Sequence, residues 1–323
     1  VCEDGAAILQ KLILFGVELS LSNAEHQLGH LGVRCHRDEG IDVKQPGWGI
    51  TEADEFVIAD LRDPQKAAEA LTGGFDEVYQ LAADMGGMGF IHSAETQIMH
   101  NSMLINVNVA EAAARAEVAR YFLASSVCVY RDMQLGEGEL SERDAYPAMP
   151  DNEYGWEKLY AERAVASYAR EGHFQARIAR FQNCYGPEGT WTGGREKAPA
   201  ALCRKVAESS DGTIEVWGDG SAVRSFIYVD DLVTAVLCLM RSDIDEPTNI
   251  GTREYVSIKK LVELVASAAD KSITPVWVPG PVGVQNRNFS NDKIETTGFQ
   301  PTVSLSEGIS RTYPWIERQV RGG

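Results

Sequence analysis

The chain has 323 residues, of which 44% are hydrophobic and 24% are charged, and its formal net charge at pH 7 is −17. These proportions are ordinary for a soluble globular protein and suffice for one large α/β domain or two interlocked ones. The negative charge argues against nucleic acid and against an anionic membrane as partners, because both would be repelled. An anionic ligand would need a local cluster of cations and backbone amides.

The six cysteines are scattered and form no CxxC pair, which argues against a disulfide framework and favours a reducing compartment. The apolar run from Ala6 to Leu19 is interrupted by charged residues and is too short to cross a bilayer. We therefore expect a cytoplasmic protein without a membrane span. His26, His30 and His36 lie near one another, but no carboxylate or thiol stands at a ligand spacing, so no metal site is expected.

Short β-rich runs alternate with helical patterns through the first half of the chain. The runs at 55–60, 77–83, 119–125 and 176–182 predict strands, and the patterns at 63–71, 98–116 and 154–170 predict helices. Asp63 and Pro64 form a good cap and first-turn pair for the first of these helices. Strand–helix alternation of this kind predicts an α/β fold with a doubly wound parallel sheet.

The second half is less regular. It predicts a strand at 224–229, a buried helix at 231–240 and a helix at 257–268 that Ser257 caps. Pro279 and Pro281 then break the chain. The last helix, at 305–319, is expected to be kinked or interrupted at Pro314.

Tyr154 and Lys158 stand four residues apart at the start of an amphipathic helix, so their side chains lie on one face. A phenol titrates near a pKa of ~10, and a neighbouring cation lowers that pKa by favouring the phenolate. Such a pair can take a proton from a substrate hydroxyl while hydride leaves for a cofactor. The alternative is a tyrosine on a helix face beside a solvated lysine.

A glycine-rich loop at 84–90 follows a predicted strand, and its backbone amides could approach a ligand closely; a tight turn between core methionines is the alternative. The strand at 121–126 ends in small hydroxyl residues and runs into Cys128. This thiol could act as an acid or base, or it could be a small buried hydrophobe.

Cations outside the first half suggest an anionic ligand. Arg195 and Lys197 follow a glycine pair just before a predicted helix, a suitable place for an anion or an acid/base group, although both could be surface charges. Arg224, Arg287 and Trp217 suit a nucleoside diphosphate, through bidentate phosphate contacts and stacking on a base.

Five segments together resemble one family. They are LAADMGGMGFI (81–91), ASSVCVY (124–130), YGWEK (154–158), NCYGPEGTWTGGREKAPAA (183–201) and WGDGSAVRSF (217–226). From about Gly40 to its end, the chain resembles the GDP-mannose 3,5-epimerases of the extended short-chain dehydrogenase/reductase superfamily. The YxxxK pair marks only the superfamily, whereas Cys128 together with GGREKAP is much more specific, because most relatives lack that thiol and lysine.

The resemblance implies roles for five side chains in the conversion of GDP-mannose. Tyr154 would deprotonate the sugar 4-hydroxyl as NAD takes the C4 hydride, with Lys158 lowering the pKa of Tyr154 and holding the nicotinamide ribose. Ser126 would hydrogen-bond the same oxygen. Cys128 and Lys197, on opposite faces of the ring, would remove and return protons at C3 and C5. Which is acid and which is base at each carbon stays open.

The resemblance also implies binding residues of three kinds. Those for the sugar, in addition to Lys197, are Gly86, Gly87, Met88 and Asn183. Those for the guanosine diphosphate are Arg224 and Arg287 at the phosphates and Trp217 near the guanine. Those for NAD, in addition to Tyr154 and Lys158, are Asp42 at the adenosine ribose and Asp60 with Leu61 beside the adenine.

For the architecture, we expect a Rossmann-type NAD-binding domain at 1–182, into which 225–250 crosses back. A smaller substrate domain would occupy 183–323. The family resemblance also implies a homodimer joined through the helices at 98–116 and 154–170.

The first forty residues depart from the family. A strand followed by GxxGxxG should receive the NAD pyrophosphate, but neither Gly5 nor Gly16 has glycine partners at that spacing. These first forty residues could come from a shifted or corrupted reading of an ordinary gene. They could instead be a divergent segment that still folds, or a sign that the protein has lost catalysis. Our hypothesis is that NAD affinity is weakened. Alternatives to the epimerase are a related nucleotide-sugar epimerase, dehydratase or decarboxylase, and a non-catalytic nucleotide-sugar binder.

Overall fold

The computed structural model describes residues 8–9, 12–15, 34–35, 38–45, 47, 53–133, 137–280 and 288–322. His26, His30, His36 and Arg287 lie outside the described residues, as do Gly5 and Gly16. The predictions that concern them are therefore not tested by the structure.

A seven-stranded parallel sheet forms the centre of the fold, in the order β12-β8-β7-β6-β2-β4-β5. Its strands are β2 (Leu12–Phe15), β4 (Asp38–Asp42), β5 (Glu55–Ile58), β6 (Glu77–Gln80), β7 (Arg120–Ser126), β8 (Gln175–Phe181) and β12 (Thr248–Ile250). The chain adds β4 and β5 on one side of β2 and then β6, β7 and β8 on the other. This reversal confirms the predicted doubly wound sheet and makes a switch point between β2 and β6.

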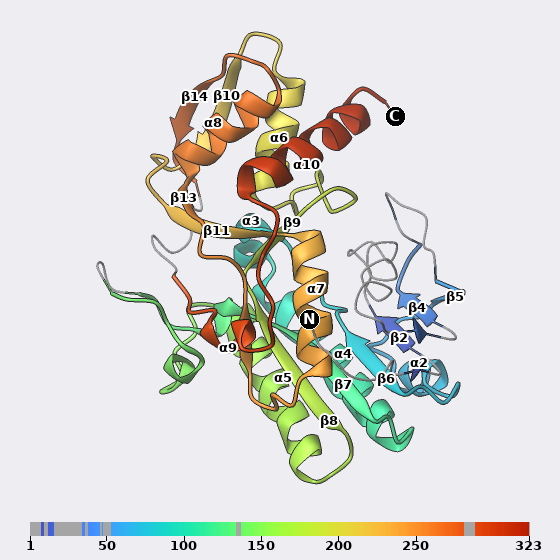
Figure 1. Cartoon of the computed structure of the whole chain (residues 1–323). Coiled ribbons are helices and arrows are strands. Elements are labelled where there is room, and N and C mark those ends of the chain that lie inside the picture. Colours follow the sequence, from blue (N-terminus) through green and yellow to red (C-terminus); the bar gives the residue numbers. More distant parts are fainter. Residues whose placement is uncertain are drawn as a thin grey trace.

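Helices cover both faces of this sheet (Figure 1). They are α2 (Pro64–Ala70), α4 (Glu95–Arg115), α5 (Glu153–Arg170) and α7 (Val229–Arg241). Adjacent residues of a strand point to opposite faces. Accordingly, Tyr121 and Leu123 pack with α2, α4 and α5, while Phe122 packs with α7 on the other face.

A smaller layer lies above the carboxyl ends of the strands in Figure 1. Its strands are β9 (Asn183–Tyr185), β10 (Thr213–Trp217), β11 (Val223–Tyr228), β13 (Tyr255–Ser257) and β14 (Thr274–Val278). Its helices are α6 (Ala198–Glu208), α8 (Ile258–Ala268) and α10 (Leu305–Val320), which enclose a separate hydrophobic core. The chain returns from this layer through α7 and β12 to the central sheet.

Most predicted elements are present, with boundaries that differ by a few residues. Asp63 caps α2 by accepting a hydrogen bond from the amide of Gln65, and Ser257 caps α8 in the same manner. The predicted interruption at Pro314 is absent, because α10 continues through this residue, whereas a kink there stays a prediction. Its buried residues, among them Ile309 and Ile316, pack against α6 and α8. We attribute the continuity of the helix to that packing, which compensates for one missing backbone hydrogen bond.

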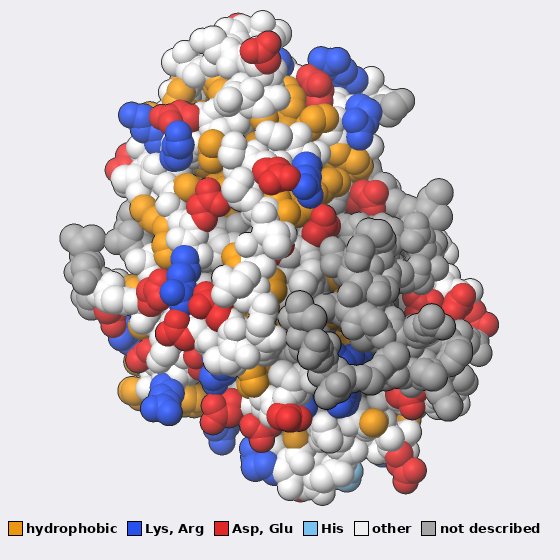
Figure 2. All heavy atoms as spheres, viewed as in Figure 1, with side chains coloured by type: hydrophobic (Ala, Val, Ile, Leu, Met, Phe, Trp, Pro, Cys, Tyr) orange, Lys and Arg blue, Asp and Glu red, His pale blue; other side chains and the backbone are white. Residues whose placement is uncertain are grey.

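Several elements were not anticipated from sequence: α3 (Met88–Ser93), α9 (Asp292–Glu295), the pair β1 (Ile8–Leu9) and β3 (Arg34–Cys35), the strands β2, β4 and β12, and β9, β10, β13 and β14 of the smaller layer. They are too short to produce a clear periodic signal. In the described part of the chain, no helix is long and apolar enough to cross a membrane. On the face shown in Figure 2, Lys and Arg side chains lie interspersed with Asp and Glu.

Candidate active site

A cavity of about 1040 Å³ lies at the carboxyl ends of the central strands, beneath the smaller layer. Segments that directly follow β4, β5, β6, β7 and β8 line it, as expected for an open parallel sheet. Every predicted site residue within the described ranges lines this cavity: Asp42, Asp60, Leu61, Gly86, Gly87, Met88, Ser126, Cys128, Tyr154, Lys158, Asn183, Lys197, Trp217 and Arg224. The tertiary fold thus brings them into one site.

Tyr154 and Lys158 project from the first turns of α5 and are both buried. Asn152 starts this helix, its side chain accepting a hydrogen bond from the amide of Gly155 at 2.9 Å. The Lys158 ammonium group donates to the carbonyl oxygen of Ala124 at 2.9 Å and lies 5.8 Å from the centroid of the Tyr154 ring. The predicted pairing on one helix face is therefore present.

Burial raises the pKa of Tyr154 well above its ordinary value, and the neighbouring Cys128 acts in the same direction. A hydrogen bond with Ser126 acts in the opposite direction and lowers this pKa, but it does not outweigh burial. A lowering of the Tyr154 pKa by Lys158 stays a prediction. In this structure Ser126 is the group that favours the phenolate.

Cys128 lies in a short 3-10 turn, Val127–Val129, that follows β7 directly. The Ser126 hydroxyl accepts a hydrogen bond from the Cys128 amide at 3.2 Å, which fixes the turn to the end of the strand. Helix α5 packs very closely here, because a Cβ atom built on Gly155 would lie only 2.1 Å from the Cys128 carbonyl oxygen. Only glycine can occupy this position without a shift of the backbone.

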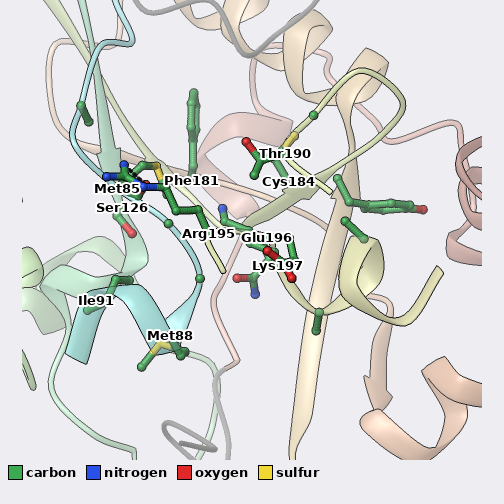
Figure 3. A pocket seen from close by; sticks show the side chains of 18 of the residues that line it. Met85, Met88, Ile91, Ser126, Phe181, Cys184, Thr190, Arg195, Glu196 and Lys197 are labelled. Atoms are coloured by element: carbon green, nitrogen blue, oxygen red, sulfur yellow. Dashed lines mark hydrogen bonds between the residues drawn. The ribbon is translucent and has the colours of Figure 1, made fainter. Parts of the chain in front are cut away.

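Lys197 is the N-cap residue of α6 and enters the cavity from the smaller layer. The segment before it pairs with the glycine-rich loop through a hydrogen bond from the Gly87 amide to the Arg195 carbonyl oxygen at 2.8 Å. Cys184 also faces this part of the cavity (Figure 3). Burial raises the pKa of Cys184 to about 12, although Lys197 acts to lower it, so this thiol stays protonated near neutral pH.

A buried ion pair supports the end of β7. Arg180, which is 1% exposed, binds Glu162 through two nitrogens at 2.9 and 2.7 Å, and Ser125 donates to the same carboxylate. The Tyr130 hydroxyl accepts from Arg180 at 3.0 Å. The sequence analysis missed these residues, since nothing local indicates that strand β8 and helix α5 contribute opposite charges to one buried contact.

The cofactor side of the cavity is formed by β4 and β5. Asp42 ends β4, next to the switch point, where an acidic residue can bind a ribose diol. Asp60 is already paired, because Arg62 donates to its carboxylate at 2.6 Å. The Asp42 carboxylate as an acceptor and the Lys158 ammonium group as a donor fit the ribose hydroxyls of NAD, and the individual contacts stay predictions.

Two of the residues predicted for the nucleoside diphosphate, Trp217 and Arg224, line the cavity from the smaller layer. Trp217 ends β10 and is 49% exposed, and Arg224 projects from β11. Lys205, which the sequence analysis missed, lies with its ammonium group 5.9 Å from the Trp217 ring centroid and lines the same cavity. Asn183 donates to the carbonyl oxygen of Ser225 at 3.2 Å, which joins β9 to β11 beside the cavity.

Comparison with known proteins identifies the family. Residues 17–251 match the model of the NAD dependent epimerase/dehydratase family. This chain belongs to that family. Its cofactor is NAD, in agreement with the sequence analysis.

The similar proteins include GDP-mannose 3,5-epimerases. The chain is 45% identical to the GDP-mannose 3,5-epimerase of Arabidopsis thaliana over 315 residues, which cover 94% of this chain and 83% of that protein. It is 41% identical to GDP-mannose 3,5-epimerase 1 of Oryza sativa subsp. japonica over 314 residues, covering 94% and 82%. A probable GDP-L-fucose synthase 1 from the same rice is 31% identical, covering 74% and 75%.

Solved structures share the fold. UDP-glucose 4-epimerase of Thermotoga maritima with UDP-glucose superimposes with a TM-score of 0.85 at 20% identity, covering 96% of this chain and all of that chain. The UDP-glucose 4-epimerase of Thermus thermophilus in complex with NAD gives a TM-score of 0.80 at 22% identity, covering 97% and 100%. The Rossmann-type fold predicted from the sequence is therefore confirmed. The domain boundaries stay a prediction.

Proposed function

We propose that this chain epimerises GDP-mannose at C3 and C5, giving GDP-L-galactose through a transient 4-keto sugar. The observation that carries the proposal is that Tyr154, Ser126, Cys128 and Lys197 all line one cavity. The identity of 41–45% to GDP-mannose 3,5-epimerases over most of the chain supports the choice of substrate. The net chemistry is isomerisation, since the cofactor is recycled within each turnover.

In this proposal, Tyr154 takes the proton of the sugar 4-hydroxyl, and the Ser126 hydroxyl donates to the same oxygen. When bound, NAD would provide the redox chemistry for the sugar C4 hydride, as its acceptor and later its source. Lys158 favours the phenolate of Tyr154 by its charge and lies on the same helix face. Because Tyr154 is buried, water is excluded from the oxygen at which the proton moves.

The 4-keto group acidifies the hydrogens on C3 and C5, so a moderate base can remove them. Cys128 follows the end of β7, whereas Lys197 starts α6 in the smaller layer. The two groups therefore approach the sugar from different layers of the fold. At each carbon, a proton removed from one face and returned from the other inverts the centre.

The alternatives are less well supported. A dehydratase is expected to carry an acid pair after Ser126 and Val127, where this chain has the thiol of Cys128. A non-catalytic nucleotide-sugar binder is suggested only by the opening of the chain, which lacks GxxGxxG. Measuring GDP-mannose binding with and without NAD separates a binder, which is indifferent to NAD, from the enzyme.

The decisive experiment is mass spectrometry of the sugar nucleotide recovered after incubation of GDP-mannose with the protein and saturating NAD in D2O. Uptake of two deuterium atoms is expected, one at each inverted carbon. Uptake of one would indicate epimerisation at a single centre. No uptake by protein with NAD bound would contradict the proposed activity.

We further propose a homodimer and a cytoplasmic location. Helices α4 and α5 pack against each other and expose Leu104, Trp156 and Tyr160, which are 38%, 38% and 47% exposed. Such an apolar surface on two adjacent helices suits a second copy of the chain. Among the cysteines whose side chains the structure describes, Cys128, Cys184, Cys203 and Cys238, none forms a disulfide, which agrees with a reducing compartment.

A further inference from the structure

Asp84 follows β6 and lies on the wall of the cavity, with its side chain 14% exposed. Its carboxylate is held from two directions. One oxygen accepts hydrogen bonds from Gln97 and Asn101 of α4, each at 2.8 Å, and the other accepts from Arg195 at 2.8 Å. Burial alone would raise the pKa of Asp84, but these three hydrogen bonds together lower it, so the carboxylate stays charged.

Arg195 makes further contacts with the same loop. Its guanidinium group lies 3.8 Å from the centroid of the Phe90 ring and donates to the Met85 carbonyl oxygen at 3.3 Å. In Figure 3 the Arg195 side chain extends toward Met85, and Glu196 and Lys197 follow it along the chain. Together with the hydrogen bond from the Gly87 amide, these contacts join the segment before α6 to the loop after β6.

The backbone at 86–87 also lies too close to the backbone at 195–196 to allow side chains between them. A Cβ atom on Gly87 would lie 2.4 Å from the Glu196 carbonyl oxygen, and one on Gly86 would lie 3.1 Å from the Arg195 Cβ atom. Lys197 is the very next residue and the N-cap of α6. A fixed backbone at 195–196 therefore determines where the Lys197 side chain enters the cavity.

We propose that Asp84 and Arg195 are positioning residues whose ion pair holds the segment that carries Lys197 and directs its ammonium group at the sugar. This inference rests on the proposed function, in which Cys128 and Lys197 each exchange a proton with the sugar. Cys128 is held by a separate contact, because its amide donates to the Ser126 hydroxyl at the end of β7 at 3.2 Å. Breaking the pair should therefore impair exchange at one carbon and spare the other.

The first test compares wild type with Asp84→Asn, Arg195→Lys and the double variant, using GDP-mannose and NAD in D2O. Wild type should take up two deuterium atoms, and the variants mainly one, since a misplacement of about 1 Å can slow a step about 100-fold. The double variant should lose no more deuterium uptake than the more affected single variant, because both substitutions disrupt the same ion pair. The matched control is Glu69→Gln, which breaks an exposed ion pair with Lys66 on α2.

Loss of stability alone would slow both exchanges equally, so an unchanged ratio of singly to doubly deuterated product would overturn the proposal. A second readout needs neither NAD nor turnover: acetylation of Lys197 by acetic anhydride, measured against exposed Lys66 by peptide mass spectrometry. Arg195→Lys should change the relative reactivity of Lys197 several-fold, and equal reactivity would overturn the proposal. If wild type takes up no deuterium, the proposed function fails, and the labelling still decides whether the pair positions Lys197.

Discussion

Burial opposes the use of Tyr154 as a base, because a charged phenolate loses more solvation free energy than a neutral phenol when water is removed. Burial and the neighbouring Cys128 raise the pKa of Tyr154, and the hydrogen bond with Ser126 lowers it. The hydroxyl that contacts the substrate oxygen in the proposed mechanism thus also determines how easily the base forms. This dual role gives Ser126 a measurable effect on pH dependence.

Replacing Ser126 with alanine removes the hydrogen bond that lowers the pKa of Tyr154, so this pKa should rise. The base form of Tyr154 then appears only at higher pH, and the acid-side limb of the pH profile of kcat/KM should move to higher pH. At neutral pH we expect a loss of about 100-fold, the lower end for a group that assists proton transfer. Ser126→Thr keeps the hydroxyl and should restore the limb. An acid-side limb that does not move in Ser126→Ala would show that this hydrogen bond does not tune Tyr154.

At the scale of single elements, helix α5 brings Tyr154 and Lys158 to the cavity because it can lie directly against the turn after β7. Gly155 allows this approach, since the Cys128 carbonyl oxygen occupies the place where a Cβ atom would stand. In an exposed helix, alanine would be favoured over glycine by about 1 kcal/mol. Here the steric effect is larger, because overpacking costs about 1–3 kcal/mol.

Gly155→Ala is therefore expected to lower the free energy of unfolding by about 1–2 kcal/mol, in spite of the better helix propensity of alanine. It should also reduce the rate of deuterium exchange, because α5 and the turn that carries Cys128 must move apart. Thermal unfolding followed by circular dichroism, together with the exchange assay, measures both effects. The control is Gly138→Ala, where a Cβ atom would meet nothing within 4 Å. A stabilised Gly155→Ala variant would refute the steric argument.

At the scale of the whole molecule, the site is made by two layers that the chain links several times. The central sheet with its flanking helices and turns supplies Tyr154, Ser126 and Cys128, and the smaller layer supplies Lys197 and Arg224. The return of the chain through α7 and β12 ties the layers together. A buried contact between Arg241 of α7 and Glu77 of β6 adds a charged link far from the cavity.

The proposed dimer predicts that Trp156→Glu combined with Tyr160→Glu yields a monomer, because two charges would be placed in an apolar interface. Light scattering coupled to size exclusion should then give half the mass of the wild-type protein. Val276→Glu, on the exposed strand β14 of the smaller layer, should leave the mass unchanged. A wild-type mass equal to one chain would exclude the dimer.

The opening of the chain leads to a prediction about NAD. Without glycines at the spacing of the family fingerprint, fewer backbone amides can approach the pyrophosphate, so we expect weakened NAD affinity. Equilibrium titration of the purified protein with NAD measures this affinity, and GDP-mannose binding in the same preparation checks that the protein is folded. Tight NAD binding would contradict the hypothesis.

The sequence by itself determined the alternation of strands and helices between residues 55 and 182, the side-chain caps at Asp63 and Ser257, and the family. Those features depend on local patterns: the alternation of strands and helices, the spacing of Tyr154 and Lys158, and short segments that are read without knowledge of contacts. Pro314 shows the limit of this reasoning, because the local rule allowed an interruption, and α10, packed against α6 and α8, continues through this residue.

Only the tertiary structure decided which groups act on one another. The Arg195 contact with Asp84 spans more than one hundred residues, and the close approach of Gly155 to Cys128 joins two elements. The pKa of Tyr154 follows from burial, which no spacing predicts. The physical reason is common to all three: burial and ion pairing depend on distances through space, and periodicity along a chain specifies only which face of an element is apolar.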